Sequence, residues 1–298
     1  MATKILLGCV ATLSLAAALS ACSPLRVINA VTSGSASEKN LDIRYGSDPR
    51  NRLDIYRPRG GDGAAPVVVF FYGGSWNMGS RTDYAFVGEA LAARGIVAVL
   101  ADYRLYPQVR YPSFVEDSAQ AVAWTLNDIQ RYGGDPKKVF VMGHSAGAYN
   151  AAMVALDGRW LAAQGTSPNA LRGWIGLAGP YDFLPISNVE VRPVFFYPDS
   201  PPQSQPVRHV TSAAPPALLV ASHADELVNA TRNTGGLAAS LRAVDVPVEE
   251  VYFDSTSHAS LIGAFAWPLR GLAPVLDKVV AFVDSDGGRN LSGARLSR

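Results

Sequence analysis

The sequence predicts an α/β protein whose central sheet is mostly parallel. Unbroken apolar runs such as Val67–Phe71 and Ile96–Ala101 are typical of strands that helices cover on both faces. Segments with helical character separate these runs. The longest covers residues 112–132, with a proline in its first turn and Gly133-Gly134 at its end. The chain has 298 residues, of which 48% are hydrophobic and 17% charged, so it can bury one large core.

Residues 1–22 have the features of a targeting segment. Lys4 supplies a positive charge, and the apolar stretch Ile5–Ala18 is too short to span a bilayer comfortably. The next residues, Leu19-Ser20-Ala21-Cys22, resemble the lipobox of bacterial lipoproteins. This resemblance implies cleavage before Cys22, lipid attachment to its thiol and, because Ser23 follows, an outer-membrane location in a host that has such a membrane. An ordinary secretory signal cleaved after Ala21 and an uncleaved anchor are the alternatives.

The chain is expected to divide into four parts. These are a signal peptide (residues 1–21), a flexible tether (22–40), a globular domain (41–285) and a disordered tail (286–298). The tether is rich in Ser, Thr, Gly and Ala and has little aromatic content. The domain begins with two strand-like segments, Leu41–Tyr45 and Arg52–Tyr56, which turn residues separate, so we expect an antiparallel hairpin.

The remaining elements follow the apolar patterning of the sequence. Further strands are predicted at residues 66–72, 96–101, 138–142, 173–177, 217–222 and 248–253, and helices at 83–94, 112–132, 148–156, 229–244 and 273–284. A proline-rich insertion, residues 183–210, follows the strand that ends near Leu177, and a loop of this length in a compact domain is usually functional. It contains Phe195-Phe196-Tyr197. We expect Phe196 to line a substrate pocket, with plain packing as the alternative.

Gly143-His144-Ser145-Ala146-Gly147 lies between a predicted buried strand and a predicted helix. A serine between two glycines at such a corner has the spacing of a nucleophile elbow. A Cβ two residues before or after Ser145 would collide with the neighbouring strand and helix, and the sharp turn lifts the serine hydroxyl clear of the sheet. The amide of Ala146, at the helix N-terminus, can then stabilise an oxygen that becomes negative. Ser145 is therefore the candidate nucleophile, and a glycine-rich turn that holds a serine by accident is the alternative.

A second glycine motif, Tyr72-Gly73-Gly74-Ser75-Trp76, follows the first apolar run. It resembles the His-Gly-Gly-x-Trp stretch of α/β-hydrolase esterases related to hormone-sensitive lipase, a group with relatives among bacterial acetyl and feruloyl esterases and arylformamidases. The resemblance implies an α/β-hydrolase fold, with a mostly parallel sheet flanked by helices. It also implies an oxyanion hole in which the amides of Gly73 or Gly74 join that of Ala146.

The motif departs from the family at its first position. Tyr72 stands where the family has histidine, so the loop must be held in a different way. Tyr72 and Trp76 are also candidate pocket residues. Further along, Asp102-Tyr103-Arg104-Leu105-Tyr106-Pro107 resembles the family's Asp-Tyr-Arg-Leu-x-Pro stretch. We expect the charges of Asp102 and Arg104 to hold loops and not to take part in catalysis.

A serine hydroxyl is a poor nucleophile unless a base takes its proton, and a carboxylate must orient that base. In α/β-hydrolases the chain order is serine, acid, histidine. Of the four histidines only His258 follows a late predicted strand with a suitable acid upstream, whereas the His144 side chain is expected to be directed away from the serine hydroxyl. Asp225 is the candidate acid, because it follows a predicted strand and forms with Val228 the Asp-x-x-Val pattern of the family. Glu226 is the second candidate.

These residues predict a serine carboxylic-ester hydrolase that acts on small, short-acyl esters through an acyl-enzyme on Ser145. An amidase or arylformamidase with the same residues, and a non-catalytic envelope lipoprotein on a hydrolase scaffold, are the alternatives. The reaction calls for no metal or organic cofactor, and the chain has no Cys-x-x-Cys or His-x-x-x-His spacing. The net charge of +1 and the lack of a basic run argue against nucleic acid as a partner. The expected partners are an ester substrate and, through Cys22, a membrane.

Overall fold

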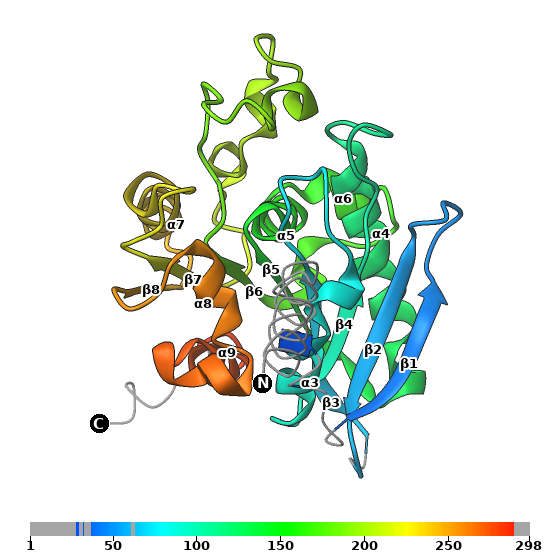
Figure 1. The fold of residues 1–298 in the computed structure, drawn as a ribbon. Helices are drawn as coiled ribbons and strands as arrows, with labels where there is room; N and C mark the ends of the chain where they lie inside the picture. Colours follow the sequence, from blue (N-terminus) through cyan, green and yellow to red (C-terminus); the bar gives the residue numbers. More distant parts are fainter. Residues whose placement is uncertain (1–27, 30–31, 33–36, 61–62, 289–298) are drawn as a thin grey trace, which may run out of the picture.

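The computed structural model describes residues 28–29, 32, 37–60 and 63–288, and its centre is an eight-stranded sheet (Figure 1). The strand order is β1-β2-β4-β3-β5-β6-β7-β8. The strands are β1 (Ser37–Arg44), β2 (Arg52–Pro58), β3 (Ala65–Phe71), β4 (Val97–Ala101), β5 (Gly134–His144), β6 (Leu171–Leu177), β7 (Ala217–Ser222) and β8 (Val248–Phe253). The pairs β1–β2 and β2–β4 are antiparallel, and every other neighbouring pair is parallel. The predicted α/β fold with a mostly parallel sheet is confirmed.

Helices cover both faces of the sheet (Figure 1). On one face α3 (Ala85–Ala92) contacts α9 (Val275–Asp284), and on the other α4 (Ser113–Asp128) packs against α5 (Ala146–Leu156) and the short α6 (Gly158–Ala162). Two further helices are α7 (Gly236–Arg242) and α8 (His258–Gly263). Within the described residues, seven of the short η segments that join the elements are 3-10 turns. Because β3 lies between β4 and β5 under these layers, Val67, Val68 and Val69 are wholly buried. This burial explains why that strand reads as a continuous apolar run.

The predicted strands all form, but some boundaries and one helix differ. The strand β1 begins at Ser37, four residues before the expected start, because pairing with β2 extends to Pro58. The helix expected at 229–244 begins with a single π turn, Thr231–Gly235, before α7. The helix α8 was not expected. It begins where Ser257 and Ser260 form a reciprocal capping box, and such a box satisfies backbone donors that the loop leaves free.

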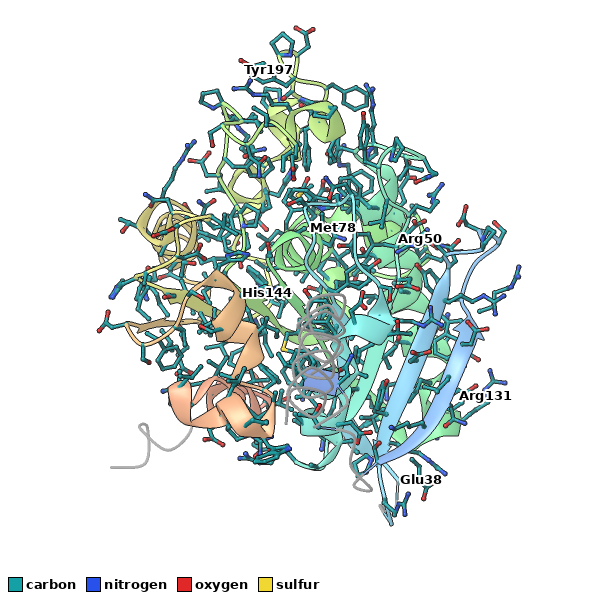
Figure 2. All side chains as sticks on the ribbon, viewed as in Figure 1. Glu38, Arg50, Met78, Arg131, His144 and Tyr197 are labelled. Carbon is teal, nitrogen blue, oxygen red and sulfur yellow. The ribbon has the colours of Figure 1, made fainter. Side chains whose placement is uncertain are left out.

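The proline-rich insertion lies above the carboxyl ends of the parallel strands (Figure 1). Figure 2 shows Tyr197 near its outer tip. It contains three 3-10 turns, Arg192–Phe195, Pro202–Ser204 and Pro206–His209. Hydrogen bonds attach it to the structure below: the Tyr149 hydroxyl, on α5, donates to the Ser204 carbonyl at 2.7 Å, and the Tyr111 amide donates to the Val194 carbonyl at 3.1 Å. The insertion is therefore a fixed wall above the sheet edge where α/β proteins place their ligands.

The predicted signal peptide and its lipid-attachment residue Cys22 lie outside the described residues, as does most of the predicted tail after Gly288. Within the part of the chain that the structure describes, no helix is both long enough and apolar enough to cross a membrane.

Candidate active site

Ser145 occupies the sharp turn between β5 and α5. Its φ of 56° and ψ of −122° are unusual for a residue with a side chain, and such strain is typical of functional corners. A Cβ on Gly143 would lie 2.1 Å from the carbonyl oxygen of Gly147, and one on Gly147 would lie 2.0 Å from the carbonyl oxygen of Phe71 in β3. The expectation that both flanking positions need glycine is confirmed. The turn places Ser145 at the edge of a pocket, with Ala146 beside it.

Asp225 and His258 form a hydrogen-bonded pair on the loops after β7 and β8. Nδ1 of His258 lies 2.7 Å from Oδ2 of Asp225, whose side chain is only 1% exposed. The other carboxylate oxygen accepts hydrogen bonds from the amides of Leu227 and Val228, both at 2.9 Å. Burial by itself raises the pKa of the Asp225 carboxyl. The hydrogen bond and charge of His258 and the two amides outweigh burial, so the pKa is lowered and the group stays ionised.

The other carboxylates on the loops after β7 and β8 are not bonded to His258. Glu226 is exposed on the same loop. Asp254 pairs with His223 at 2.7 Å, and both of these side chains are largely exposed. Of the carboxylates after β7 and β8, Asp225 is the one bonded to His258.

Ser145 and His258 line the same pocket, which has a volume of about 120 Å³. Within the described part of the chain the Ser145 hydroxyl makes no direct hydrogen bond to the histidine ring. Catalytic hydrogen bonds are commonly long in ligand-free enzymes and shorten when substrate binds. The structure thus brings the serine, the histidine and, behind the histidine, the aspartate to one place.

His144 connects the elbow to the loop of His258. Its ring is buried, and its Nε2 lies 3.0 Å from the His258 carbonyl oxygen. Because a carbonyl only accepts, Nε2 must carry the hydrogen. Burial, with a smaller effect of nearby His258, lowers the pKa of His144 to about 3, so the ring is neutral at working pH. The sequence predicts a side chain directed away from Ser145, but it gives no sign of this link to His258.

The backbone amides around Ser145 are the candidate donors to an anion. The N–H groups of Gly74, Ser75 and Ala146 donate no hydrogen bond within the described residues. Ser75 and Ala146 also line the pocket. The amides of Gly74, Ser75 and Ala146 are therefore free to bind an anion here, and the role predicted for the Gly73 amide stays a prediction.

The sequence did not predict a donor role for the Ser75 amide, because glycine is the residue expected where a ligand approaches the backbone closely. Ser75 and Trp76 both have positive φ, 50° and 57°, without being glycine. The turn that imposes these angles is closed by hydrogen bonds from the amides of Asn77 and Met78 to the Gly74 carbonyl. No local sequence rule marks such a serine.

Comparison with known proteins identifies the family. The BD-FAE family model matches residues 53–239, which is more than half of the chain. The chain belongs to the BD-FAE family. It is 32% identical to an Arabidopsis thaliana isoprenylcysteine alpha-carbonyl methylesterase over 82% of this chain and 62% of that protein, and 31% identical to a second, probable methylesterase of the same plant over 86% and 66%. The chain thus spans slightly less than two thirds of these relatives.

Solved structures support the same fold for this BD-FAE protein. Esterase B from Lactobacillus rhamnosis superposes with a TM-score of 0.75, covering 98% of this chain and 99% of that one at 19% identity. A Pyrobaculum calidifontis esterase gives a TM-score of 0.70 at 23% identity, covering 88% and 90%. At these identities the likeness establishes the α/β-hydrolase fold.

The three candidate pocket residues of this BD-FAE chain have different positions. Trp76 lines the pocket and is 2% exposed. Tyr72 is wholly buried behind the loop and does not line it. Phe196 does not line the pocket, contrary to the prediction. The residue is 40% exposed, and its ring lies beneath the Arg110 guanidinium. The insertion contributes other apolar residues to the wall, namely Phe183, Ile186 and Val191.

Proposed function

We propose that this protein is a carboxylic-ester hydrolase that works through an acyl-enzyme on Ser145. The observation that carries the proposal is the buried Asp225–His258 pair, which opens on the same pocket as a serine in a strained elbow. The similarity to the methylesterases supports ester hydrolysis as the reaction class.

The geometry suggests a role for each group. Because Nδ1 of His258 is bonded to Asp225, Nε2 is the nitrogen left to take the Ser145 proton as the hydroxyl attacks the ester carbonyl. The carbonyl oxygen becomes negative and accepts hydrogen bonds from the free amides of Gly74 or Ser75 and of Ala146. His258 then returns the proton to the leaving alcohol. A water molecule, activated by the same nitrogen, releases the acid from Ser145.

The pocket favours small and uncharged substrates. Apart from the His258 ring, the side chains that line it are not ionisable: Ser75, Trp76, Ser145, Ala146, Pro180, Phe183, Ile186, Ser187, Asn188, Val191, Leu227 and Val228. Leu227 is 75% exposed and marks the mouth, whereas Trp76 is almost wholly buried and closes the inner end. Its indole Nε1 donates to Oδ1 of Asn150 at 3.0 Å, which fixes the ring. A fixed ring at the end of a small pocket supports a short acyl chain.

This proposal predicts that Trp76→Phe shifts the substrate preference toward longer acyl chains. The kcat/KM ratio for p-nitrophenyl octanoate over p-nitrophenyl acetate should rise by about tenfold, the effect of one or two extra methylenes in an apolar pocket. The assay runs both esters and the matching anilides, so that ester and amide preferences are separated. Trp124→Phe is the matched control, since Trp124 packs against Tyr132 away from the pocket. An unchanged ratio would remove Trp76 from the acyl site, and faster anilide than ester hydrolysis would overturn the reaction class.

For the N-terminus we propose lipid attachment at Cys22 in the cell envelope, in the outer membrane where the host has one. The support is the lipobox-like Leu19-Ser20-Ala21-Cys22. Wild-type protein expressed in a bacterium with an alkyne-labelled fatty acid should incorporate label and fractionate with membranes, because several acyl chains on one residue give stable anchoring. Cys22→Ser should lose both properties, whereas Cys9→Ser should keep them. Label that persists in Cys22→Ser would contradict this.

A further inference from the structure

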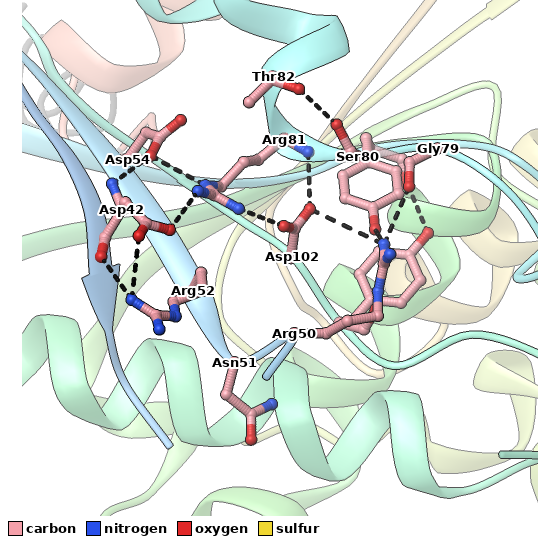
Figure 3. Close-up of polar contacts among 12 residues, drawn as sticks. Asp42, Arg50, Asn51, Arg52, Asp54, Gly79, Ser80, Arg81, Thr82 and Asp102 are labelled. Atoms are coloured by element: carbon pink, nitrogen blue, oxygen red, sulfur yellow. Dashed lines mark hydrogen bonds and ion pairs between the residues drawn. The ribbon is translucent and has the colours of Figure 1, made fainter. Parts of the chain in front are cut away.

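The loop that carries Gly74 and Ser75 is fastened at its base by Arg50. Nη2 of Arg50 donates to the Tyr72 hydroxyl at 2.7 Å and to the Gly79 carbonyl at 2.9 Å. Its Nε donates to the Tyr103 carbonyl at 3.0 Å. Figure 3 shows Arg50 beside Gly79, on the side of Asp102 away from Arg81. One side chain therefore connects the first and last residues of the loop 72–79.

Tyr72 is the second part of this connection. It is wholly buried, its ring stacks on Tyr103 with centroids 4.6 Å apart, and its carbonyl accepts the Tyr103 hydroxyl at 2.8 Å. The loop returns so closely to the ring that a Cβ on Gly79 would lie 2.9 Å from two Tyr72 ring carbons. Glycine at this position, with φ of 101°, allows the return. The loop thus encloses the Tyr72 ring, and Arg50 joins its two ends through hydrogen bonds to Tyr72 and Gly79.

The loop residues that carry the free amides come directly after Tyr72 in the chain. Gly73, Gly74 and Ser75 continue from Tyr72, and a Cβ on Gly73 would lie 3.0 Å from the Ser145 Cβ, so the loop runs against the elbow. A small displacement of Tyr72 or Gly79 would move the Gly74 and Ser75 amides relative to Ser145. Oxyanion donors act only when they are held in advance at the position where the charge develops.

We propose that Arg50 and Tyr72 are positioning residues, which hold the Gly74 and Ser75 amides in place for the tetrahedral intermediate. The inference rests on the proposed function, because only a reaction that forms an oxyanion needs these donors. Neither side chain lines the pocket, so neither acts on substrate directly. The pair accounts for tyrosine at a position where the esterases that this sequence resembles have histidine.

A neighbouring network of ion pairs around Arg81 connects strands rather than the loop. Arg81 binds Asp42, Asp54 and Asp102 and so joins β1, β2 and the residue after β4 (Figure 3). Its contacts lie beyond the loop, among strands at the edge of the sheet. Among the described residues, the link between Arg50 and this network is Asp102, whose Oδ1 lies 4.0 Å from Nη2 of Arg50. We therefore expect changes at Arg81 to affect stability, and changes at Arg50 to affect the chemical step.

The test compares Arg50→Gln, Tyr72→Phe and the double variant with wild type. Because loss of one oxyanion donor costs about 10²–10³ in kcat, partial misplacement in Arg50→Gln should lower kcat by about 10- to 100-fold, with KM changed by less than about threefold. Tyr72→Phe keeps the ring and its stacking and should lower kcat by about 3- to 10-fold. The double variant should be no slower than Arg50→Gln, since both changes break one connection. The rate of inactivation by a fluorophosphonate, which forms a tetrahedral adduct on the serine, should fall by the same factors.

Arg52→Gln is the matched control. Arg52 lies two residues further on and bonds the carbonyl and the carboxylate of Asp42, but within the described residues its side chain donates no hydrogen bond to the loop 72–79. Its kcat should match wild type. The inference is overturned if Arg50→Gln and Tyr72→Phe both have a kcat like that of Arg52→Gln, or if their losses appear in KM alone. If instead Ser145→Ala retains wild-type activity, the proposed function itself has failed. Should Arg50→Gln not fold, Tyr72→Phe and its inactivation rate decide the question.

Discussion

Ser145→Ala should lower kcat for p-nitrophenyl acetate by about 10⁴- to 10⁶-fold, because the serine, histidine and aspartate act as a unit and none replaces another. The substitution removes one oxygen at a position where φ is already 56°, and alanine has the same Cβ, so the fold should be unchanged. Circular dichroism and thermal unfolding check that point. Substrate binding should persist, because the other residues that line the pocket, including Trp76, and the free amides remain.

Ser240→Ala is the control for Ser145→Ala, since Ser240 lies on α7, outside the pocket, and its hydroxyl donates to the Gly236 carbonyl. The control should be labelled by a fluorophosphonate probe as wild type is, and Ser145→Ala should not. Peptide mapping should find the label on Ser145. Less than about a tenfold loss of kcat in Ser145→Ala would show that another residue is the nucleophile.

Asp225→Asn should lower kcat by about 10⁴-fold, as the same change does in serine proteases, where it leaves the wrong histidine tautomer. The structure supplies the reason. The amides of Leu227 and Val228 both donate to one oxygen of residue 225, so they select the asparagine orientation that presents its NH₂ to His258. Nδ1 of His258 must then accept, Nε2 carries the hydrogen, and the ring cannot take the Ser145 proton.

Glu226→Gln, at the adjacent residue, is the control for Asp225→Asn. It neutralises a carboxylate on the same loop, but that side chain is exposed, so kcat should stay at the wild-type value. The pKa of Asp225 is lowered, so its carboxylate is charged at neutral pH. A loss in Asp225→Asn no larger than in Glu226→Gln would contradict the assignment of the acid.

The strands could be placed from the sequence because their pattern is local. Val67–Phe71 and Ile96–Ala101 are continuous apolar runs, and both are buried between helical layers as expected. The start of β1 and the helix α8 were not predicted. Pairing with β2 lengthens β1, and the capping box of Ser257 and Ser260 marks the start of α8. Both features depend on hydrogen-bond partners rather than on hydrophobic periodicity.

The sequence by itself determined the parallel sheet, the glycine-flanked serine and the chain order of serine, acid and histidine, because spacing along the chain encodes turns and the order of loops along a sheet edge. Only the tertiary structure decided which groups face the pocket. It selected Phe183 over Phe196, it placed Ser75 in the pocket lining, and it joined Arg50 to the Tyr72 hydroxyl. These choices depend on contacts between residues far apart in the chain. No local pattern contains them, because the same side chain can face a pocket, a neighbour or solvent according to what packs against it.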